Sequence, residues 1–306
     1  MLQMKSATFS LADAAKGTQD VLTVEVITPS LADPDKSRPA VLFLPFWGGS
    51  ASTFNQVITH LEGSHLQSTY LFISYAGTGN TPAPMNDAAK MHSIIPRARQ
   101  LKCLLQEPDL RELTSKRLII CAHSMSAKIA YHLLTLLDHE QTQLTNLILL
   151  GPAPVGPLIL PPDMQQQQLQ AYQTQDSAAS TIENVLTAGT GKLGSDVVAE
   201  LAKDCASMSP GAKRGWPEYG MAVDCSEIVK EVRSKWSQLS VKILVGSEDK
   251  VETVERVTEG TVIPLQNSGF DVELSVIDTA GHLLPAEAPV AVLEAVFAAL
   301  GDVRMC

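Results

Sequence analysis

The sequence predicts an α/β protein with a mostly parallel central sheet, helices on both faces and a helical lid. Short, almost entirely apolar runs, such as Val41–Leu44, Leu71–Ser74 and Leu147–Leu150, alternate with longer segments of helical periodicity. Strands of this kind are buried on both faces, which is typical of parallel sheets between helices. The chain has 306 residues, of which 45% are hydrophobic, so it can bury one large core.

Composition excludes several classes of partner. The net charge is −10 and no block of Lys or Arg occurs, so we expect neither a nucleic acid nor a membrane surface as partner. No run approaches the length of a membrane span, and residues 1–10 lack the apolar core of a secretory signal. Five cysteines without metal-like spacing predict free thiols in a reducing compartment. We therefore expect a cytoplasmic protein without metal or cofactor, and the sequence leaves a homodimer open.

The N-terminal part of the chain begins with a predicted strand at Val21–Thr28, where β-branched residues alternate with others. Turn residues follow it at 29–36. After the buried strand already described, Ser52 or Thr53 can cap a helix that runs to about Leu61.

Later segments continue the alternation of strands and helices. A long turn-rich loop, Tyr75–Pro82, precedes the helical pattern of Met91–Leu105. Near the C-terminus, Val241–Val245 and Val272–Ile277 are predicted strands, and Ala286–Leu300 is a predicted amphipathic helix.

The bend at Ser124 is the most informative feature of the sequence. Leu118–His123 is an apolar run, and the residues after Ser124 are apolar at helical spacing, so a buried strand enters a helix with almost no loop. Such a turn strains the backbone of its middle residue and exposes that side chain at the end of the sheet. It also points the first N–H groups of the helix at whatever the side chain attacks. The sequence therefore predicts that Ser124 is a nucleophile.

The amino-acid composition changes at residues 157–236. This segment contains a glutamine run, several Gly, Ser and Pro breaks, and no predicted strand. Apolar residues at helical spacing favour a helical lid over a disordered linker. We thus predict a core of residues 1–156 and 237–306, with a lid of residues 157–236 inserted between strands.

Two other residues follow strand ends on the same predicted edge. Asp249 comes after Val241–Val245, and His282 comes after Val272–Ile277 and a glycine. Active sites of parallel sheets collect at the carboxyl ends of the strands. A serine needs a base, and the base needs a carboxylate to hold its tautomer. Of the seven histidines, four lie in or beside predicted helices, His123 is expected to point away from Ser124, and His132 lies two helical turns beyond it.

These motifs together resemble the α/β-hydrolase fold of the serine-nucleophile type, over roughly Val21 to the C-terminus. In order, the segments resemble the family's oxyanion loop, Gly-x-Gly-x-Ser loop, nucleophile elbow, acid turn and histidine loop: Leu42–Ser50, Gly77–Thr81, His123–Ser126, Val245–Asp249 and Thr279–Pro285. The resemblance implies a Ser124, Asp249 and His282 triad, in the chain order of that family.

The resemblance also implies other site residues. The backbone N–H groups of Met125 and Trp47 would hold an oxyanion. Apart from the resemblance, we expect Phe46, Trp47 and Met125 to line an apolar pocket under a lid that contains Trp216 and Tyr219. The chain departs from the family where Ala122 and Ser126 replace the elbow glycines and where Pro45-Phe46 replaces His-Gly. Losing one oxyanion donor costs about 10²–10³ in rate, so the altered loop bears on esterase efficiency.

Three functions are compatible with this site. The first is a serine hydrolase that cleaves an ester, thioester or lactone of a small to medium apolar substrate through an acyl-enzyme. The second uses the same triad for carbon–carbon bond hydrolysis, or for cyclisation or dehydration of a polyketide-like substrate. The third is a ligand-binding receptor with little turnover. The sequence does not specify the small-molecule substrate, because the lid determines it and fold alone does not fix function.

Overall fold

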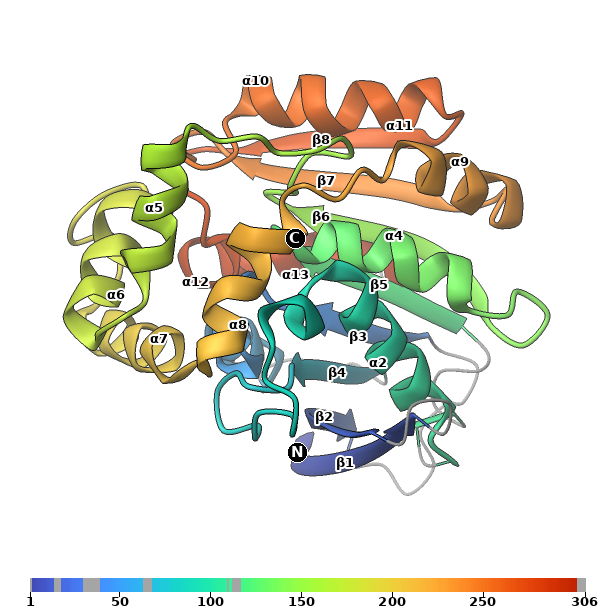
Figure 1. Cartoon of the computed structure of the whole chain (residues 1–306). Coiled ribbons are helices and arrows are strands. Elements are labelled where there is room, and N and C mark those ends of the chain that lie inside the picture. The colour runs from blue at the N-terminus through green and yellow to red at the C-terminus, as the bar shows by residue number, and fades with distance from the viewer. Residues whose placement is uncertain are drawn as a thin grey trace.

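The computed structural model describes residues 2–13, 18–29, 39–62, 68–108, 110–111 and 117–301. One eight-stranded sheet crosses the molecule in the order β1-β2-β4-β3-β5-β6-β7-β8 (Figure 1). The strands are β1 (Leu2–Asp13), β2 (Thr18–Pro29), β3 (Ala40–Leu44), β4 (Thr69–Ser74), β5 (Arg117–His123), β6 (Gln143–Leu150), β7 (Ser240–Gly246) and β8 (Asp271–Ile277). Strands β1 and β2 pair antiparallel with their neighbours. The other six strands, β3 to β8, are parallel to one another. The predicted α/β class with a mostly parallel sheet is confirmed.

Helices cover both faces of the sheet because side chains alternate between the faces along each strand. Leu42 and Leu44 of β3 belong to the larger core cluster, whereas Val41 and Phe43 belong to the second. The helices against the larger cluster are α2 (Ile94–Gln106), α4 (Ser126–Leu136) and α9 (Ser226–Lys235). Those against the second are α1 (Asn55–Glu62), α12 (Leu284–Glu287) and α13 (Pro289–Leu300).

The segment between β6 and β7 is helical, as predicted, and residues 157–236 contain no strand. It comprises α5 (Pro162–Ala171), α6 (Gln175–Thr181), the π-helical turn η3 (Ile182–Leu186), α7 (Ser195–Ser207), α8 (Pro210–Gly215) and the π-helical turn η4 (Trp216–Gly220), followed by α9. Helices α5 to α8 gather beyond the arrowheads of the strands (Figure 1). They therefore lie at the edge of the sheet where the sequence places the site.

Backbone hydrogen bonds connect the beginning of this helical segment to its end. Leu158 N–H donates to Met221 O at 2.8 Å, and Cys225 N–H donates to Val155 O at 2.9 Å. Helix α9, which the predicted lid of residues 157–236 includes, packs on α4 beside the sheet. The predicted boundary at residue 236 remains a prediction.

Several predicted boundaries are wrong for local reasons. Ser50, not Ser52 or Thr53, is the cap: its Oγ accepts from the Ser52 N–H at 3.2 Å, and a 3-10 turn, η1 (Ala51–Phe54), precedes α1. The predicted helix Met91–Leu105 divides into a 3-10 turn, η2 (Ala89–His92), and α2, because Ser93 is extended.

The C-terminal helix also divides. Ala288 lies between α12 and α13 with a non-helical backbone, since the residue before a proline disfavours the α conformation.

Two elements were not predicted. Strand β1 lies at the sheet edge, and its apolar residues change phase near Ser6, which weakens the alternating pattern. A helical segment between β7 and β8 consists of α10 (Val254–Val257), the π-helical turn η5 (Thr258–Val262) and α11 (Ile263–Asn267), whose glycine and proline obscure the periodicity. Residues 30–36 of the predicted turn and Cys306 lie outside the described residues.

Within the described ranges, every helix is too short or too polar to cross a bilayer.

Candidate active site

Ser124 occupies a strained turn between β5 and α4. Its φ is +57°, in the left-handed region that residues with a Cβ rarely adopt. Its N–H donates to Leu150 O at 2.9 Å, and its carbonyl accepts from Ala127 N–H at 3.0 Å and Ala153 N–H at 3.2 Å. The neighbours Ala122 and Ser126 are completely buried. The turn is thus fixed by the adjacent strand and the first turn of α4, and the Ser124 side chain remains partly exposed.

The structure brings Ser124, Asp249 and His282 into one hydrogen-bonded row. His282 Nδ1 lies 2.8 Å from Asp249 Oδ2, and His282 Nε2 lies 2.9 Å from Ser124 Oγ. Asp249 follows β7 and His282 follows β8, so each side chain comes from the carboxyl end of a different strand. With a proton on Nδ1, the imidazole donates to the carboxylate and accepts from the hydroxyl. This arrangement can remove the serine proton during attack.

The charges of the row support that protonation pattern. Burial opposes ionisation of Asp249, but the charge and hydrogen bond of His282, with the N–H groups of Glu252 and Val251, hold the pKa of this carboxyl below its usual value. Burial acts to lower the pKa of His282, but Asp249 outweighs it, and the pKa of His282 lies above its usual value. The pair therefore stabilises the imidazolium that would form as Ser124 loses its proton.

The loop that carries His282 is held from two sides. Glu287 accepts from Gly281 N–H at 3.0 Å and Leu283 N–H at 3.2 Å through its two carboxylate oxygens. From the helical segment between β6 and β7, Leu186 O accepts from His282 N–H at 2.8 Å. Sequence reasoning found neither partner: Glu287 is close in sequence but has no motif that marks its role, and Leu186 becomes a neighbour only through the tertiary fold.

His123 is another contact of His282 that sequence reasoning excluded. Its Nε2–H donates to the carbonyl oxygen of His282 at 2.7 Å, and the two rings lie 5.2 Å apart. Burial lowers the pKa of His123 to about 3, so the ring is neutral and acts as a fixed donor. The side chain therefore supports the backbone of the base.

Gly151, directly after β6, leaves the space that the His282–Asp249 pair occupies. Its φ is +45°, and a Cβ there would lie 3.0 Å from His282 Nδ1 and 3.1 Å from Asp249 Oδ2. The sequence shows a glycine at a strand end, but the side chains it accommodates come from residues about 100 and 130 positions later.

We expect Gly151→Ala to lower kcat by about 10- to 100-fold, because small displacements of catalytic groups have effects of this order. Gly156→Ala is the matched control, since a Cβ at Gly156 meets no atom within 4 Å. Steady-state hydrolysis of a chromogenic ester by both variants measures the effect. Equal rates for the two variants would contradict the assigned role of Gly151.

The predicted oxyanion donors lie on two sides of Ser124. Met125 follows Ser124 directly, and Trp47 lies in the loop after β3. In the described part of the chain, neither backbone N–H donates to another protein group. Their use by a substrate oxygen stays a prediction.

The aromatic residues predicted to line a pocket have different environments. The Phe46 ring lies 5.4 Å from the His123 ring and is buried below the loop. Trp47 links that loop to the helical segment between β6 and β7, since its ring lies 4.6 Å from the Tyr172 ring and its Nε1–H donates to Ala212 O at 3.3 Å. Trp216 is buried, but Tyr219 is 46% exposed. This exposure does not favour Tyr219 as a pocket residue.

Glu252 is a buried carboxyl group behind Asp249. It lines a cavity of about 350 Å³ between the turn after β7 and the helical segment between β6 and β7, together with Val251, Leu160, Met164 and others. Its Oε2 lies 3.7 Å from Arg256 Nε, and its backbone N–H donates to Asp249 Oδ1. Burial raises the pKa of Glu252 to about 7, against the attraction of Arg256. Glu252 therefore changes its charge within the neutral range.

We expect Glu252→Gln to change the pH dependence of stability. Because the folded pKa is raised, the stabilising contribution of Glu252 is complete below the unfolded pKa of about 4.3 and is lost as pH rises through about 7. Gln does not titrate, so the variant avoids this loss. Its unfolding free energy minus that of the native protein should therefore rise by about 3 kcal/mol between pH 4.5 and pH 8. Denaturant unfolding at both pH values measures this, with the exposed Glu259→Gln as control. Parallel pH dependences of Glu252→Gln and native protein would contradict the prediction.

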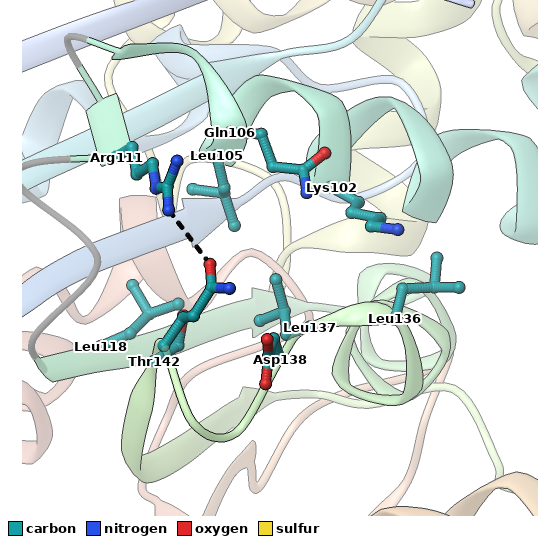
Figure 2. Close-up of a pocket in the computed structure, with 10 residues that line it drawn as sticks. Lys102, Leu105, Gln106, Arg111, Leu118, Leu136, Leu137, Asp138 and Thr142 are labelled. Atoms are coloured by element: carbon teal, nitrogen blue, oxygen red, sulfur yellow. Dashed lines mark hydrogen bonds between the residues drawn. The ribbon is translucent and has the colours of Figure 1, made fainter.

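A second cavity, of about 560 Å³, lies between α2, α4 and the turn before β6 (Figure 2). Leu118 at the start of β5 and Leu137 after α4 line it, and Arg111 donates to Gln141 Oε1 across it at 3.3 Å. It lies at the amino ends of the strands. This cavity is therefore at the end of the sheet opposite to Ser124.

Comparison with known proteins finds a matching family model and solved structures of similar fold. A model described as the alpha/beta hydrolase family matches residues 41–295. No curated protein matches the sequence significantly. The chain is similar in structure to an esterase from Exiguobacterium antarcticum, with 18% identity, coverage of 95% of this chain and 99% of that chain, and a TM-score of 0.72.

Two further solved structures have comparable similarity. Carboxylesterase CesB from Bacillus subtilis has 16% identity, coverage of 97% and 92%, and a TM-score of 0.66. The 2-hydroxy-6-oxo-6-phenylhexa-2,4-dienoate hydrolase from Rhodococcus sp. strain RHA1 has 15% identity, coverage of 98% and 100%, and a TM-score of 0.72. At these identities the likeness concerns the fold.

Proposed function

The chain belongs to the alpha/beta hydrolase family, and on this premise we propose that it is a serine hydrolase of esters, thioesters or lactones. The observation that carries the proposal is the position of His282, whose two ring nitrogens lie 2.9 Å from Ser124 Oγ and 2.8 Å from Asp249 Oδ2. A carboxylate, an imidazole and a hydroxyl in this order supply a nucleophile, its base and the group that orients the base.

The proposed reaction has two stages. Ser124 Oγ attacks the carbonyl carbon while His282 Nε2 takes the hydroxyl proton, and His282 then gives that proton to the leaving oxygen or sulfur. Asp249 stabilises the imidazolium between these transfers. Water, deprotonated by His282, then releases the acid from Ser124 and restores the site.

The negative charge that develops on the carbonyl oxygen needs donors beside Ser124. The N–H groups of Met125 and Trp47 supply them in the proposal, with Met125 at the beginning of α4. Because Trp47 also contacts the lid through Tyr172 and Ala212, the second donor depends on the position of the lid.

A substrate screen tests the proposal against the other two functions. We expect turnover of 4-nitrophenyl esters and thioesters from acetate to dodecanoate, with an optimum of chain length. Activity on a β-diketone without activity on any ester would favour carbon–carbon bond hydrolysis instead. Ligand-induced stabilisation without any product would favour a receptor. Either outcome would overturn the proposed hydrolase.

A further inference from the structure

Arg97, in the first turn of α2, is a buried cation that has no counter-ion among the described residues. Its side chain is 2% exposed, and its Nε and Nη2 atoms have no hydrogen-bond partner. In the described part of the chain, the one hydrogen-bond acceptor of its Nη1 is a sulfur, Met125 Sδ, at 4.0 Å. Among the described residues, no carboxylate lies within ion-pair distance of it. Buried charges in proteins are normally paired, so this guanidinium lacks the anion that would balance it.

The protein compensates the Arg97 charge only in part. The guanidinium carbon lies 4.5 Å from the centre of the Tyr75 ring, which is a cation–π contact. Burial raises the pKa of Tyr75 to about 12, so the phenol does not supply a negative charge at neutral pH. His92, the other titratable group near Arg97, is not an anion either. Buried arginines usually form charge-assisted hydrogen bonds to a carboxylate or phosphate. Arg97 has only a weak sulfur acceptor and one aromatic ring as described partners.

The unpartnered atoms have the geometry of a carboxylate site. Nε and Nη2 share one edge of the planar guanidinium, and their two parallel N–H groups match the two oxygens of a carboxylate. The face of the guanidinium rests on Tyr75, which fixes the plane. The Met125 side chain is unbranched and flexible, and its sulfur lies where an anion could contact Nη1.

The position of Arg97 connects it to the reaction. Met125 follows Ser124, so one residue provides both the N–H aimed at the substrate carbonyl and the side chain that contacts Arg97. The Tyr75 hydroxyl lies 3.2 Å from Ser126 Oγ, which donates to Pro45 O in the predicted oxyanion loop. The lid turn η4 packs against α2. Arg97 thus lies where the nucleophile turn, the oxyanion loop and the lid meet.

We propose that Arg97 binds a carboxylate on the acyl part of the substrate, so that the substrate is the ester or thioester of a dicarboxylic acid. The inference rests on the proposed function, because it assigns the acyl carbonyl to Ser124 and the Met125 N–H. The carboxylate lies at the far end of the acyl chain, about the length of the Met125 side chain from that carbonyl. It takes the unpartnered Nε–Nη2 edge of Arg97, beside the Nη1 atom that Met125 Sδ contacts.

A matched pair of esters tests this assignment. We expect kcat/KM for 4-nitrophenyl hydrogen adipate to exceed that for 4-nitrophenyl hexanoate by at least about tenfold, the effect of a charged hydrogen-bonded pair. In Arg97→Met this ratio should fall to about one, and in Arg97→Lys it should fall in part. Arg99→Met, an exposed arginine of the same helix, is the control and should keep the ratio of the native protein. No preference in the native protein, or an unchanged ratio in Arg97→Met, would overturn the proposal.

A binding measurement separates this proposal from the proposed hydrolase function. Adipate should raise the melting temperature of Ser124→Ala and should not raise that of Ser124→Ala/Arg97→Met. If neither ester is cleaved but adipate stabilises only the protein with Arg97, the hydrolase proposal fails and the carboxylate site stands. If both esters are cleaved equally and adipate has no effect, the hydrolase stands and the carboxylate site fails. If Arg97→Met does not fold, an unchanged ratio in Arg97→Lys overturns the bidentate site.

Discussion

Ser124→Ala is expected to lower kcat for ester hydrolysis by about 10⁶-fold, the order found when a triad nucleophile is removed. The loss should be large because Ser124 Oγ is the only hydroxyl on His282 Nε2 in the described structure. Remaining donors and binding would sustain only a small residual rate. Single-turnover and steady-state assays with the best ester of the chain-length series measure the change.

The control for this prediction is Ser234→Ala, on the exposed face of α9. It should retain the rate of the native protein. A kcat for Ser124→Ala within tenfold of that value, with an unchanged circular dichroism spectrum, would contradict a covalent role for Ser124. The same hydrolysis would then have to use another group on the rim of the sheet.

Asp249→Asn is expected to lower kcat by about 10⁴-fold while the fold is kept. Asp249 Oδ1 accepts from the N–H groups of Val251 and Glu252, so this position retains the amide oxygen in the variant. The amide NH₂ then replaces Oδ2 and faces His282 Nδ1 as a donor. The imidazole has to accept there and carry its proton on Nε2, which removes the acceptor that Ser124 needs.

The control for the acid is Asp224→Asn, an exposed residue whose carboxylate accepts from the Ser226 N–H. It should leave kcat unchanged. Rates of Asp249→Asn within tenfold of the native protein would mean that the carboxylate does not set the tautomer of His282. Nitrogen-15 chemical shifts of the His282 ring give an independent measure of that tautomer.

The central strands and the turn at Ser124 could be predicted from sequence because their signals are local. Leu118–His123 is apolar and is followed directly by apolar residues at helical spacing. One short segment therefore contains the sequence signals for the strand, the bend and the helix. Asp249 and His282 were predicted from a rule of parallel sheets, since each follows a strand end. In the structure His282 lies within hydrogen-bond distance of Ser124, and Asp249 lies within hydrogen-bond distance of His282.

Other parts of the site depend on neighbours that are distant in sequence. Gly151 is an ordinary strand-end glycine until His282 and Asp249 occupy the space beside it. His123 was excluded because it was expected to point away from Ser124. Its side chain nevertheless forms a hydrogen bond with the backbone of His282. Arg97 follows the apolar start of a predicted helix, and nothing in the sequence indicates that its charge is buried and unpaired.

The helical segment between β6 and β7 also contains features that could not be predicted from the sequence. Its helical character follows from spacing, but the exposure of Tyr219 and the burial of Trp216, three positions apart, depend on how the π-helical turn η4 sits on the core. A π-helical turn changes the phase of the side chains, and so a helical period read from sequence misplaces them.

The most direct test of the central claim is covalent labelling with a fluorophosphonate probe followed by peptide mass spectrometry. The hydroxyl that His282 activates should be the one that reacts, so we predict a single adduct on the peptide that contains Ser124, absent from Ser124→Ala and strongly slowed in Asp249→Asn. An adduct on a different residue, or equal labelling of the native protein and Ser124→Ala, would contradict the account.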